Sequence, residues 1–146
     1  MCGSYFFSFR VSGGAFDPEY LGFNLKLRAK YTRKKGDDIL DKHGNRIGVV
    51  LESFGSFEPP QMVDDNLIAS VELLMDRLES SKELLEEIRV FGSTFEIYVR
   101  FFSSDSTGER FPALLLHRLS RLGISLAVEF FPQQDQTRQS TEIREQ

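Results

Sequence analysis

The stretch Thr94–Phe102 reads Thr-Phe-Glu-Ile-Tyr-Val-Arg-Phe-Phe and decides the fold class. Its side chains alternate with a period of two, which is typical of a half-buried β-strand. One face carries Phe95, Ile97, Val99 and Phe101, and the other carries Glu96, Tyr98, Arg100 and Phe102. We expect this strand to be the central strand of a sheet that the rest of the chain covers.

Two further stretches alternate in the same way and are predicted to be strands. Tyr5–Val11 places alternate aromatic residues on one face and ends at Ser12-Gly13-Gly14, where glycines permit a break in pairing. Ile124–Phe131 is the last predicted strand. The residues expected to point inward are Ile124, Leu126, Val128 and Phe130.

Three helices are predicted from their caps and apolar spacing. The first begins at Asp17-Pro18-Glu19, an N-cap followed by Pro at the first helical position, and Gly22 is expected to end it. The longest covers about Asp64–Arg89, with a kink expected at Ser80-Ser81. Its predicted N-cap is Asp64 or Asp65.

The third helix is predicted to open at Pro112 and to end before Gly123, a natural residue beyond a helix C-terminus. Between the first and second helices, the basic segment 26–35 is interpreted as an edge strand that Gly36 closes. Asp41–Asn45 is predicted to be a turn, and Ile47–Phe57 to supply one or two short strands.

These elements predict an α+β fold. Strand 5–11, the helix near 17–22 and the strand near 25–31 repeat the order of strand 94–102, helix 112–122 and strand 124–131. Two β-α-β units of this kind favour a ferredoxin-like, mostly antiparallel sheet of about five strands with helices packed on one face. We expect residues 1–132 to form a single domain and residues 133–146 a disordered polar tail.

Composition excludes several classes of protein. The 146 residues include a single cysteine, Cys2, so no internal disulfide can form, which favours a reducing compartment. No signal peptide or membrane span is predicted, and the net charge of −4 disfavours indiscriminate nucleic-acid binding. We therefore expect a cytoplasmic protein with no cofactor, no metal and no contact with a membrane.

Several short motifs resemble an uncharacterised bacterial family, the domain-of-unknown-function family 4279. They are Asp17-Pro18-Glu19 with Leu21-Gly22, Arg33-Lys34-Lys35-Gly36-Asp37, Leu74-Met75-Asp76-Arg77-Leu78, and the stretch from Leu119 to Leu126. The resemblance covers about residues 5–131. It implies a compact α+β domain and brings no functional residues with it.

The polar face of the sheet is the first candidate site. If the strands are neighbours, it gathers aromatic and arginine side chains, which are typical of protein interfaces. Alternatively, its aromatic residues belong to the edge of the core, and Arg100 and Glu129 form a cross-strand pair. The candidate residues are Arg10, Tyr98, Arg100, Phe102, Glu129 and Phe131, with Glu96 beside them.

The basic segment is the second candidate site. It could bind RNA or another anionic ligand, or it could be a solvated edge strand that faces the acidic long helix. Its candidate residues are Lys26, Arg28, Lys30, Tyr31, Arg33, Lys34 and Lys35.

Catalytic and metal motifs are weak. The acidic turn Asp37–Asn45 lacks the register of a calcium loop, and His43 and His117 are too far apart in sequence to indicate a zinc site or a triad. An enzyme would have to gather Asp37 with both histidines. The leading hypothesis is a non-catalytic interaction module that binds another protein, in an immunity-type role for example, or a second copy of itself.

Overall fold

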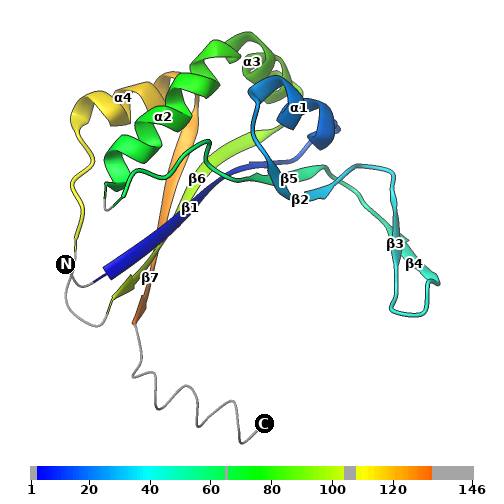
Figure 1. Ribbon diagram of the computed structural model, residues 1–146. Helices are drawn as coiled ribbons and strands as arrows, with labels where there is room; N and C mark the ends of the chain where they lie inside the picture. Colours follow the sequence, from blue (N-terminus) through cyan, green and yellow to red (C-terminus); the bar gives the residue numbers. More distant parts are fainter. Residues whose placement is uncertain (1–2, 65, 104–107, 133–146) are drawn as a thin grey trace, which may run out of the picture.

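The structure, a computed structural model, describes residues 3–64, 66–103 and 108–132 (Figure 1). Within these residues it has a five-stranded sheet, a separate two-stranded sheet and four helices. The elements in chain order are β1 (Gly3–Ser12), α1 (Pro18–Leu25), β2 (Ala29–Arg33), β3 (Asp38–Leu40), β4 (Arg46–Val49), β5 (Phe54–Phe57), α2 (Leu67–Ser80), α3 (Lys82–Val90), β6 (Thr94–Ser103), α4 (Ala113–Arg121) and β7 (Ile124–Pro132). The predicted tail 133–146 lies outside the described residues.

The main sheet has the strand order β2-β5-β1-β6-β7. Strand β1 is antiparallel to both β5 and β6, β2 is antiparallel to β5, and β6 is parallel to β7. The first four of these strands therefore follow the split β-α-β arrangement of a ferredoxin-like fold, and α4 with β7 adds one parallel strand at the edge. The predicted α+β class is confirmed, and the strand order, which the sequence left open, is that of a ferredoxin-like fold. The second predicted β-α-β unit, residues 94–131, is the added parallel unit β6-α4-β7 and not the second half of that fold.

The position predicted for strand 94–102 is wrong in one respect. The central strand is β1, and β6 lies between β1 and the edge strand β7. The inward face of β6 is nevertheless the predicted one, because Phe95, Ile97, Val99 and Phe101 are all buried. The alternation identifies the face of a strand, whereas strand order depends on pairing between distant segments.

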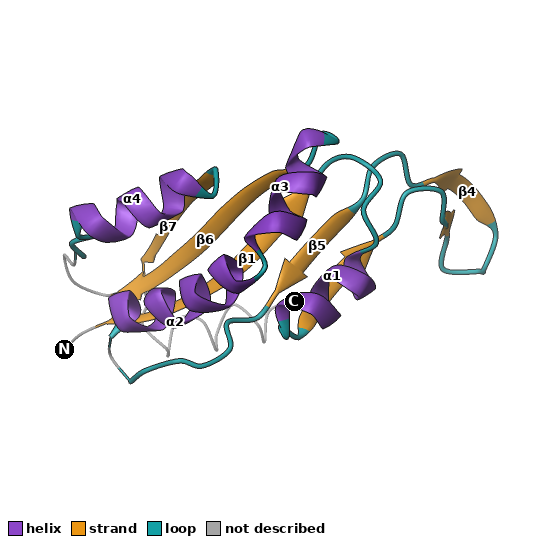
Figure 2. Cartoon of the chain, turned by 90° about the horizontal axis from the view of Figure 1, so that it is seen from above, coloured by secondary structure: helices purple, strands orange, loops and turns teal. Residues whose placement is uncertain are grey.

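All four described helices cover the same face of the main sheet (Figures 1 and 2). The core lies between the two layers, where Phe9, Val11 and Ile97 of the sheet and Leu74 and Met75 of α2 have no exposed surface. Each ring or aliphatic side chain buried in this way contributes about 1.5–3 kcal/mol. No described helix covers the opposite face of the sheet, which is called here the open face.

Helix α1 begins as predicted but does not end at Gly22. The Asp17 carboxylate accepts hydrogen bonds from the backbone N–H groups of Glu19 (3.0 Å) and Tyr20 (3.3 Å), which lowers the pKa of this carboxyl against the opposing effect of burial. The helix runs on to Leu25, and Lys26 ends it in the left-handed conformation (φ 55°). Gly22 is needed for packing instead, because a Cβ there would lie 3.1 Å from the Phe57 ring.

The long predicted helix is two helices that meet at Ser81, where the kink was expected. Its N-cap is neither predicted aspartate. Asn66 caps α2, its side-chain oxygen accepting from the Ala69 N–H at 3.0 Å, and Asp65 lies outside the described residues. The apolar stripe of α2 is buried as predicted.

Helix α4 ends as predicted before Gly123, which has φ 71°. The inward face predicted for β7 is only partly confirmed. Ile124 is buried, but Val128 and Phe130 are 38% and 59% exposed. Strand β7 is an edge strand, so its later residues have a neighbour on one side only, and the Phe130 ring stacks on Phe101 at 5.2 Å.

Strands β3 and β4 form a separate hairpin, called here the arm, which projects from the end of the main sheet (Figure 1). The predicted turn at its tip is confirmed, because the Asp41 carboxylate accepts from the N–H groups of His43 (2.8 Å) and Asn45 (2.9 Å). Its apolar side chains are poorly covered: Leu40 is 57% exposed and Ile47 is 67% exposed.

Candidate binding face

The open face of the main sheet brings together all the residues predicted for it. The register pairs Phe6 with Arg100 and Arg10 with Glu96 across β1 and β6, and it pairs Arg100 with Glu129 across β6 and β7. The remaining candidates follow the same alternation: Tyr98 is opposite Ser8, and Phe102 is opposite Phe131. The sequence did not decide whether these strands are adjacent, and in the structure β1, β6 and β7 are adjacent.

One end of this face carries three phenylalanines, called here the aromatic cluster. The rings of Phe6 and Phe102 meet edge to face at 5.9 Å, and those of Phe102 and Phe131 stack at 5.3 Å. Phe6 is 56% exposed and Phe131 is 37% exposed, so the cluster is open to solvent. Arg100 lies beside it, with its guanidinium 5.9 Å from the Phe102 ring centroid.

Tyr98 occupies the middle of the open face and yet is only 8% exposed. The Arg10 guanidinium covers its ring at 3.8 Å from the centroid, a cation–π distance. Burial, together with a hydrogen bond to the Glu129 carboxylate, raises the pKa of the Tyr98 hydroxyl. Arg10 also lies 3.8 Å from the Glu96 carboxylate. The predicted cross-strand neighbours Arg100 and Glu129 are adjacent, but Glu129 engages Tyr98.

The basic segment does not form one continuous strip. The prediction of an edge strand is confirmed by β2, in which Tyr31 and Arg33 face the same side as Phe54 and Ser56 of β5. Arg33 donates a hydrogen bond to the Tyr31 hydroxyl. Other members are used elsewhere.

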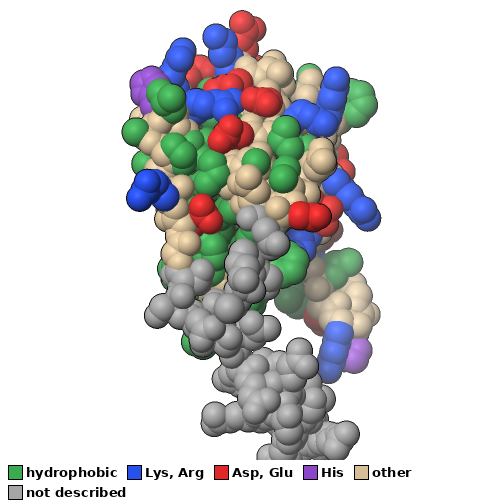
Figure 3. Space-filling model, turned by 60° about the vertical axis from the view of Figure 1, so that its left-hand side comes forward, with side chains coloured by type: hydrophobic (Ala, Val, Ile, Leu, Met, Phe, Trp, Pro, Cys, Tyr) green, Lys and Arg blue, Asp and Glu red, His purple; other side chains and the backbone are tan. Residues whose placement is uncertain are grey.

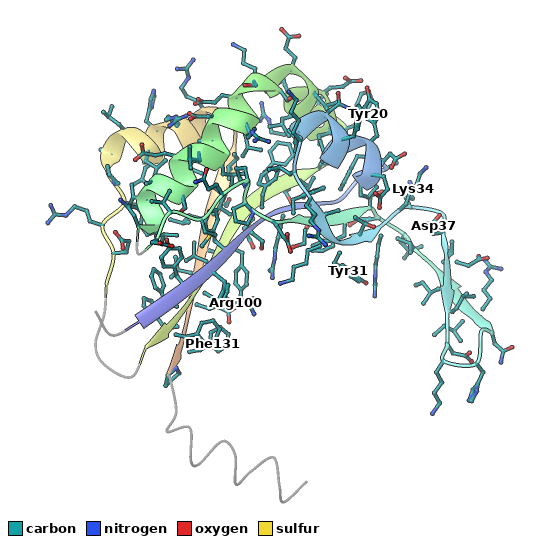
Figure 4. The ribbon with its side chains drawn as sticks, viewed as in Figure 1. Tyr20, Tyr31, Lys34, Asp37, Arg100 and Phe131 are labelled. Carbon is teal, nitrogen blue, oxygen red and sulfur yellow. The ribbon has the colours of Figure 1, made fainter. Side chains whose placement is uncertain are left out.

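Lys26 and Lys34 are engaged with helices of the covered face. The Lys26 carbonyl accepts from Arg77 of α2 at 2.7 Å, and the Lys34 amine lies 3.5 Å from the Asp17 carboxylate at the start of α1. Figure 4 shows this division: Tyr31, Arg100 and Phe131 lie on the underside of the sheet, whereas Lys34 is close to the junction with the arm.

The two candidate sites meet in a hollow of about 660 Å³ on the open face. Arg10, Tyr98 and Arg100 from the predicted sheet face line it together with Lys30 and Tyr31 from the basic segment. The two sets of residues meet because β5 pairs with β1 on one side and with β2 on the other. The other lining residues are Phe6, Phe7, Ser8, Phe54, Ser56, Glu58, Pro59 and Met62.

Sequence reasoning missed several of these lining residues. Phe6 had a usable signal, since it shares the outward register of Arg10 on β1. Phe54 and Ser56 could be assigned only once β5 was known to pair with β1. Met62 lies with Pro59 and Pro60 in the segment between β5 and α2, and no local pattern marks it.

A second recess, of about 680 Å³, lies between the base of the arm and β2. Ile39, Val49 and Leu51 line it from the arm side, and Tyr31 and Phe54 line both it and the first hollow. The open face and the arm therefore form one continuous concave surface.

The weaker sequence candidates are not assembled into a site. His43 lies in the turn of the arm and His117 on α4, at opposite ends of the molecule in Figure 1. Asp37 stands at the start of the arm in Figure 4. Across the described residues, no group of three or more histidine, cysteine or acidic side chains could hold a metal ion. Cys2 lies outside the described residues.

The helical side carries charges of both signs. Figure 3, which brings the α4 side forward, shows acidic and basic side chains mixed around the helices with hydrophobic ones between them. Arg118 of α4 donates to Asp76 at 2.7 Å and to Glu79 at 2.6 Å, both on α2. These ion pairs join α4 to α2 across the helical side. None of the described helices has the length and apolar character needed to cross a bilayer.

A family model described as Domain of unknown function (DUF4279) matches residues 4–130. No curated protein matches the chain. Among solved structures, a formyltetrahydrofolate deformylase from Pseudomonas putida KT2440 is similar with 13% identity and a TM-score of 0.26. The match covers 97% of this chain and 55% of that one, and a likeness at this level carries no argument about fold or function.

Proposed function

We propose that the chain, which belongs to the DUF4279 family of domains of unknown function, is a non-catalytic interaction module of the cytoplasm. Its binding surface is the open face of the main sheet, and its partner is another protein or a second copy of the chain. The observation that carries the proposal is the aromatic cluster next to Arg100. An immunity-type role, in which a module neutralises a toxin by covering it, needs no more than such a surface.

The aromatic cluster supports protein binding because of its composition and its place. Phenylalanine and arginine are enriched at protein interfaces, and arginine is frequent among the few residues that contribute most of the binding free energy. Phe6, Phe102 and Phe131 stand at positions of the strand pattern where a solvated face would carry polar residues. Burial of one such exposed ring by a partner contributes about 1–3 kcal/mol.

The arm supports self-association in particular. A two-stranded hairpin is marginally stable alone in water, and this one leaves Leu40 and Ile47 more than half exposed. Leu51, at its base, is 76% exposed. Because the arm and the open face form one concave surface, two copies related by a two-fold axis could each cover the other's arm in the same interface.

The test is the solution mass of the purified chain by light scattering, at low and at high salt. We expect a salt-resistant dimer whose association weakens in an Arg100→Ala, Phe102→Ala double variant with an unchanged circular dichroism spectrum. Phe23→Ala is the matched control, because Phe23 is 83% exposed on α1, away from the open face.

Two results would count against the proposal. Unchanged association in the folded double variant would remove the open face as the interface. A wild-type monomer at all concentrations would remove self-association, and a pull-down from native cytosol with the same variants would then test a different protein partner.

A second candidate function is the binding of single-stranded RNA along β2. It is favoured by Tyr31, which is 48% exposed and could stack on a base, with Lys30 and Arg33 beside it. Such binding would fall steeply with salt. A filter-binding assay that shows no retention of single-stranded RNA at low salt would exclude it.

A further inference from the structure

We propose that the 660 Å³ hollow is a binding site for a small planar anion, that is, an aromatic or heteroaromatic ring carrying a carboxylate or a phosphate. The site is built from β1, β2, β5 and β6 together with the segment after β5. It shares Phe6 and Arg100 with the protein interface proposed above, but Lys30 lines the hollow alone and can be altered without touching the aromatic cluster.

The lining of the hollow carries an excess of positive charge. Arg10, Lys30 and Arg100 line it, against a single acid, Glu58. In the described part of the chain, neither Lys30 nor Arg100 forms an ion pair, and Arg10 has only the long 3.8 Å approach to Glu96. Elsewhere on the same chain, arginines such as Arg118 are tightly paired. Lys30 and Arg100 are therefore free to pair with an anionic ligand, and Arg10 lines the same hollow.

Arg10 supplies the most specific evidence. Its Nε is buried and has no hydrogen-bond partner within the described residues. Buried donors of this kind are rare, since nearly all find an acceptor in protein, water or ligand. The Arg10 guanidinium carbon lies 3.8 Å from the centroid of the Tyr98 ring, and this contact holds the guanidinium over the ring. Arginine held in this way suits a carboxylate or phosphate, to which it can donate two parallel hydrogen bonds.

The aromatic part of the lining points to a ring on the ligand. Tyr31 and Phe54 lie with their ring centroids 5.9 Å apart at one side of the hollow, and Phe6 lies at another. Pro59 and Met62 form an apolar wall. The volume falls within the ~300–1,000 Å³ typical of small-molecule sites. A bare inorganic anion would leave these apolar surfaces uncovered, whereas a ring would cover them.

The experiment is isothermal titration calorimetry of the full chain with four probes. Adenosine monophosphate and indole-3-acetate represent the two sources of the anion, a phosphate and a carboxylate. Adenosine and inorganic phosphate are the matched halves of adenosine monophosphate. We expect at least one of the two ring-bearing anions to bind about tenfold or more tightly than adenosine and than inorganic phosphate. The probe that binds more tightly shows whether the site prefers a phosphate or a carboxylate.

Paired variants locate the site. Lys30→Gln is expected to weaken binding of the better probe about tenfold, whereas Lys34→Gln, in the same basic segment but paired with Asp17, is expected to leave it unchanged. Both lysines are exposed, so neither change threatens the fold. Phe102→Ala, on the open face outside the hollow, serves as a second control and separates this site from the proposed protein interface.

Three results would overturn the inference. The first is the absence of binding by both ring-bearing anions at millimolar concentration. The second is inorganic phosphate binding as tightly as adenosine monophosphate, which would mean that the ring is not recognised. The third is an equal loss in the Lys30→Gln and Lys34→Gln variants, which would place binding outside the hollow.

Discussion

Replacing Gly55 by Ala tests how α1 is attached to the sheet. Gly55 lies on β5, on the helix side, and a Cβ there would lie 2.8 Å from both Cε2 and Cζ of Phe57. The same ring approaches the position of a Cβ on Gly22 of α1 at 3.1 Å. The fully buried Phe57 ring therefore occupies space left by two glycines.

The magnitude follows from these contacts. A normal carbon–carbon contact is about 3.5–4.0 Å, so the new methyl group overlaps the ring by about 1 Å. Overpacking of this size costs about 1–3 kcal/mol, while replacing a strand glycine by alanine returns about 0.5–1 kcal/mol from the unfolded state. We expect a net loss of about 1–2 kcal/mol, which lowers the urea midpoint by about 0.5–1 M.

The assay is a double-mutant cycle by urea denaturation. Phe57→Leu alone is expected to cost about 1–2 kcal/mol through the volume it removes. Combined with Gly55→Ala, it should cost at least about 1 kcal/mol less than the sum, because the smaller side chain makes room for the methyl group. Gly48→Ala is the control, since a Cβ there meets Ile39 at an ordinary 3.8 Å. Additive effects in the cycle, or a stable Gly55→Ala variant, would refute the packing described here.

Three further predictions concern stability and titration. Arg118→Gln should destabilise the chain by about 0.5–1 kcal/mol at neutral pH. Because the hydrogen bonds from Arg118 lower the pKa of Glu79, this difference in stability should shrink as the pH falls through the folded pKa of Glu79. Urea denaturation across pH 3–7 measures it. Lys26→Gly should stabilise the chain by about 0.5–1 kcal/mol, since Lys26 is a non-glycine residue held in the left-handed region at φ 55°. A loss of stability of the same size would show that the Lys26 side chain contributes more than the backbone strain costs. Tyr98 should titrate at a higher pH than an ordinary tyrosine in an ultraviolet pH titration, because burial raises its pKa. Above about pH 10 the folded state then binds more protons than the unfolded state, so the free energy of unfolding should fall as the pH rises. The fall should be less steep in the Tyr98→Phe variant.

For β1 and β6, alternation was enough to predict which residues face the core, whereas at the edge strand β7 it predicted Val128 and Phe130 to be inward although both are exposed. The inward residues of β1 and β6 are fixed by a period of two, and a shift of one position would expose all of them together. The same alternation placed Arg10, Tyr98 and Arg100 on the opposite face. These predictions succeeded because the information is local.

Caps and helix ends were harder to predict because neighbouring residues carry the same signal. Asp64, Asp65 and Asn66 are all good N-cap residues, and only the position of the buried Leu67 selects Asn66. Gly22 is the residue type expected at a helix end. It lies inside α1 instead because Phe57, thirty-five positions away in the sequence, needs the space.

The hollow could not be predicted from the sequence because it depends on strand order. Arg10 and Tyr31 lie on strands that are not neighbours, and β5 inserts between them so that Ser56 pairs with both residues. The sequence suggested the two sites separately and gave no reason to join them. Long-range pairing, which closes loops of tens of residues, has no signature in a local window.

The two halves of the open face have different physical characters, which argues that they serve different ligands. The aromatic cluster is exposed: Phe6 meets Phe102 edge to face, Phe102 stacks on Phe131, and these rings need only a complementary surface to become buried. The hollow is concave and is lined by three cations, Arg10, Lys30 and Arg100, so a protein side chain that filled it would have to bring an anionic group. If one partner filled both, Lys30→Gln would weaken association as strongly as the Arg100→Ala, Phe102→Ala double variant. We expect instead that Lys30→Gln leaves the solution mass unchanged while it weakens small-anion binding, and loss of the dimer in that variant would show that the hollow belongs to the protein interface.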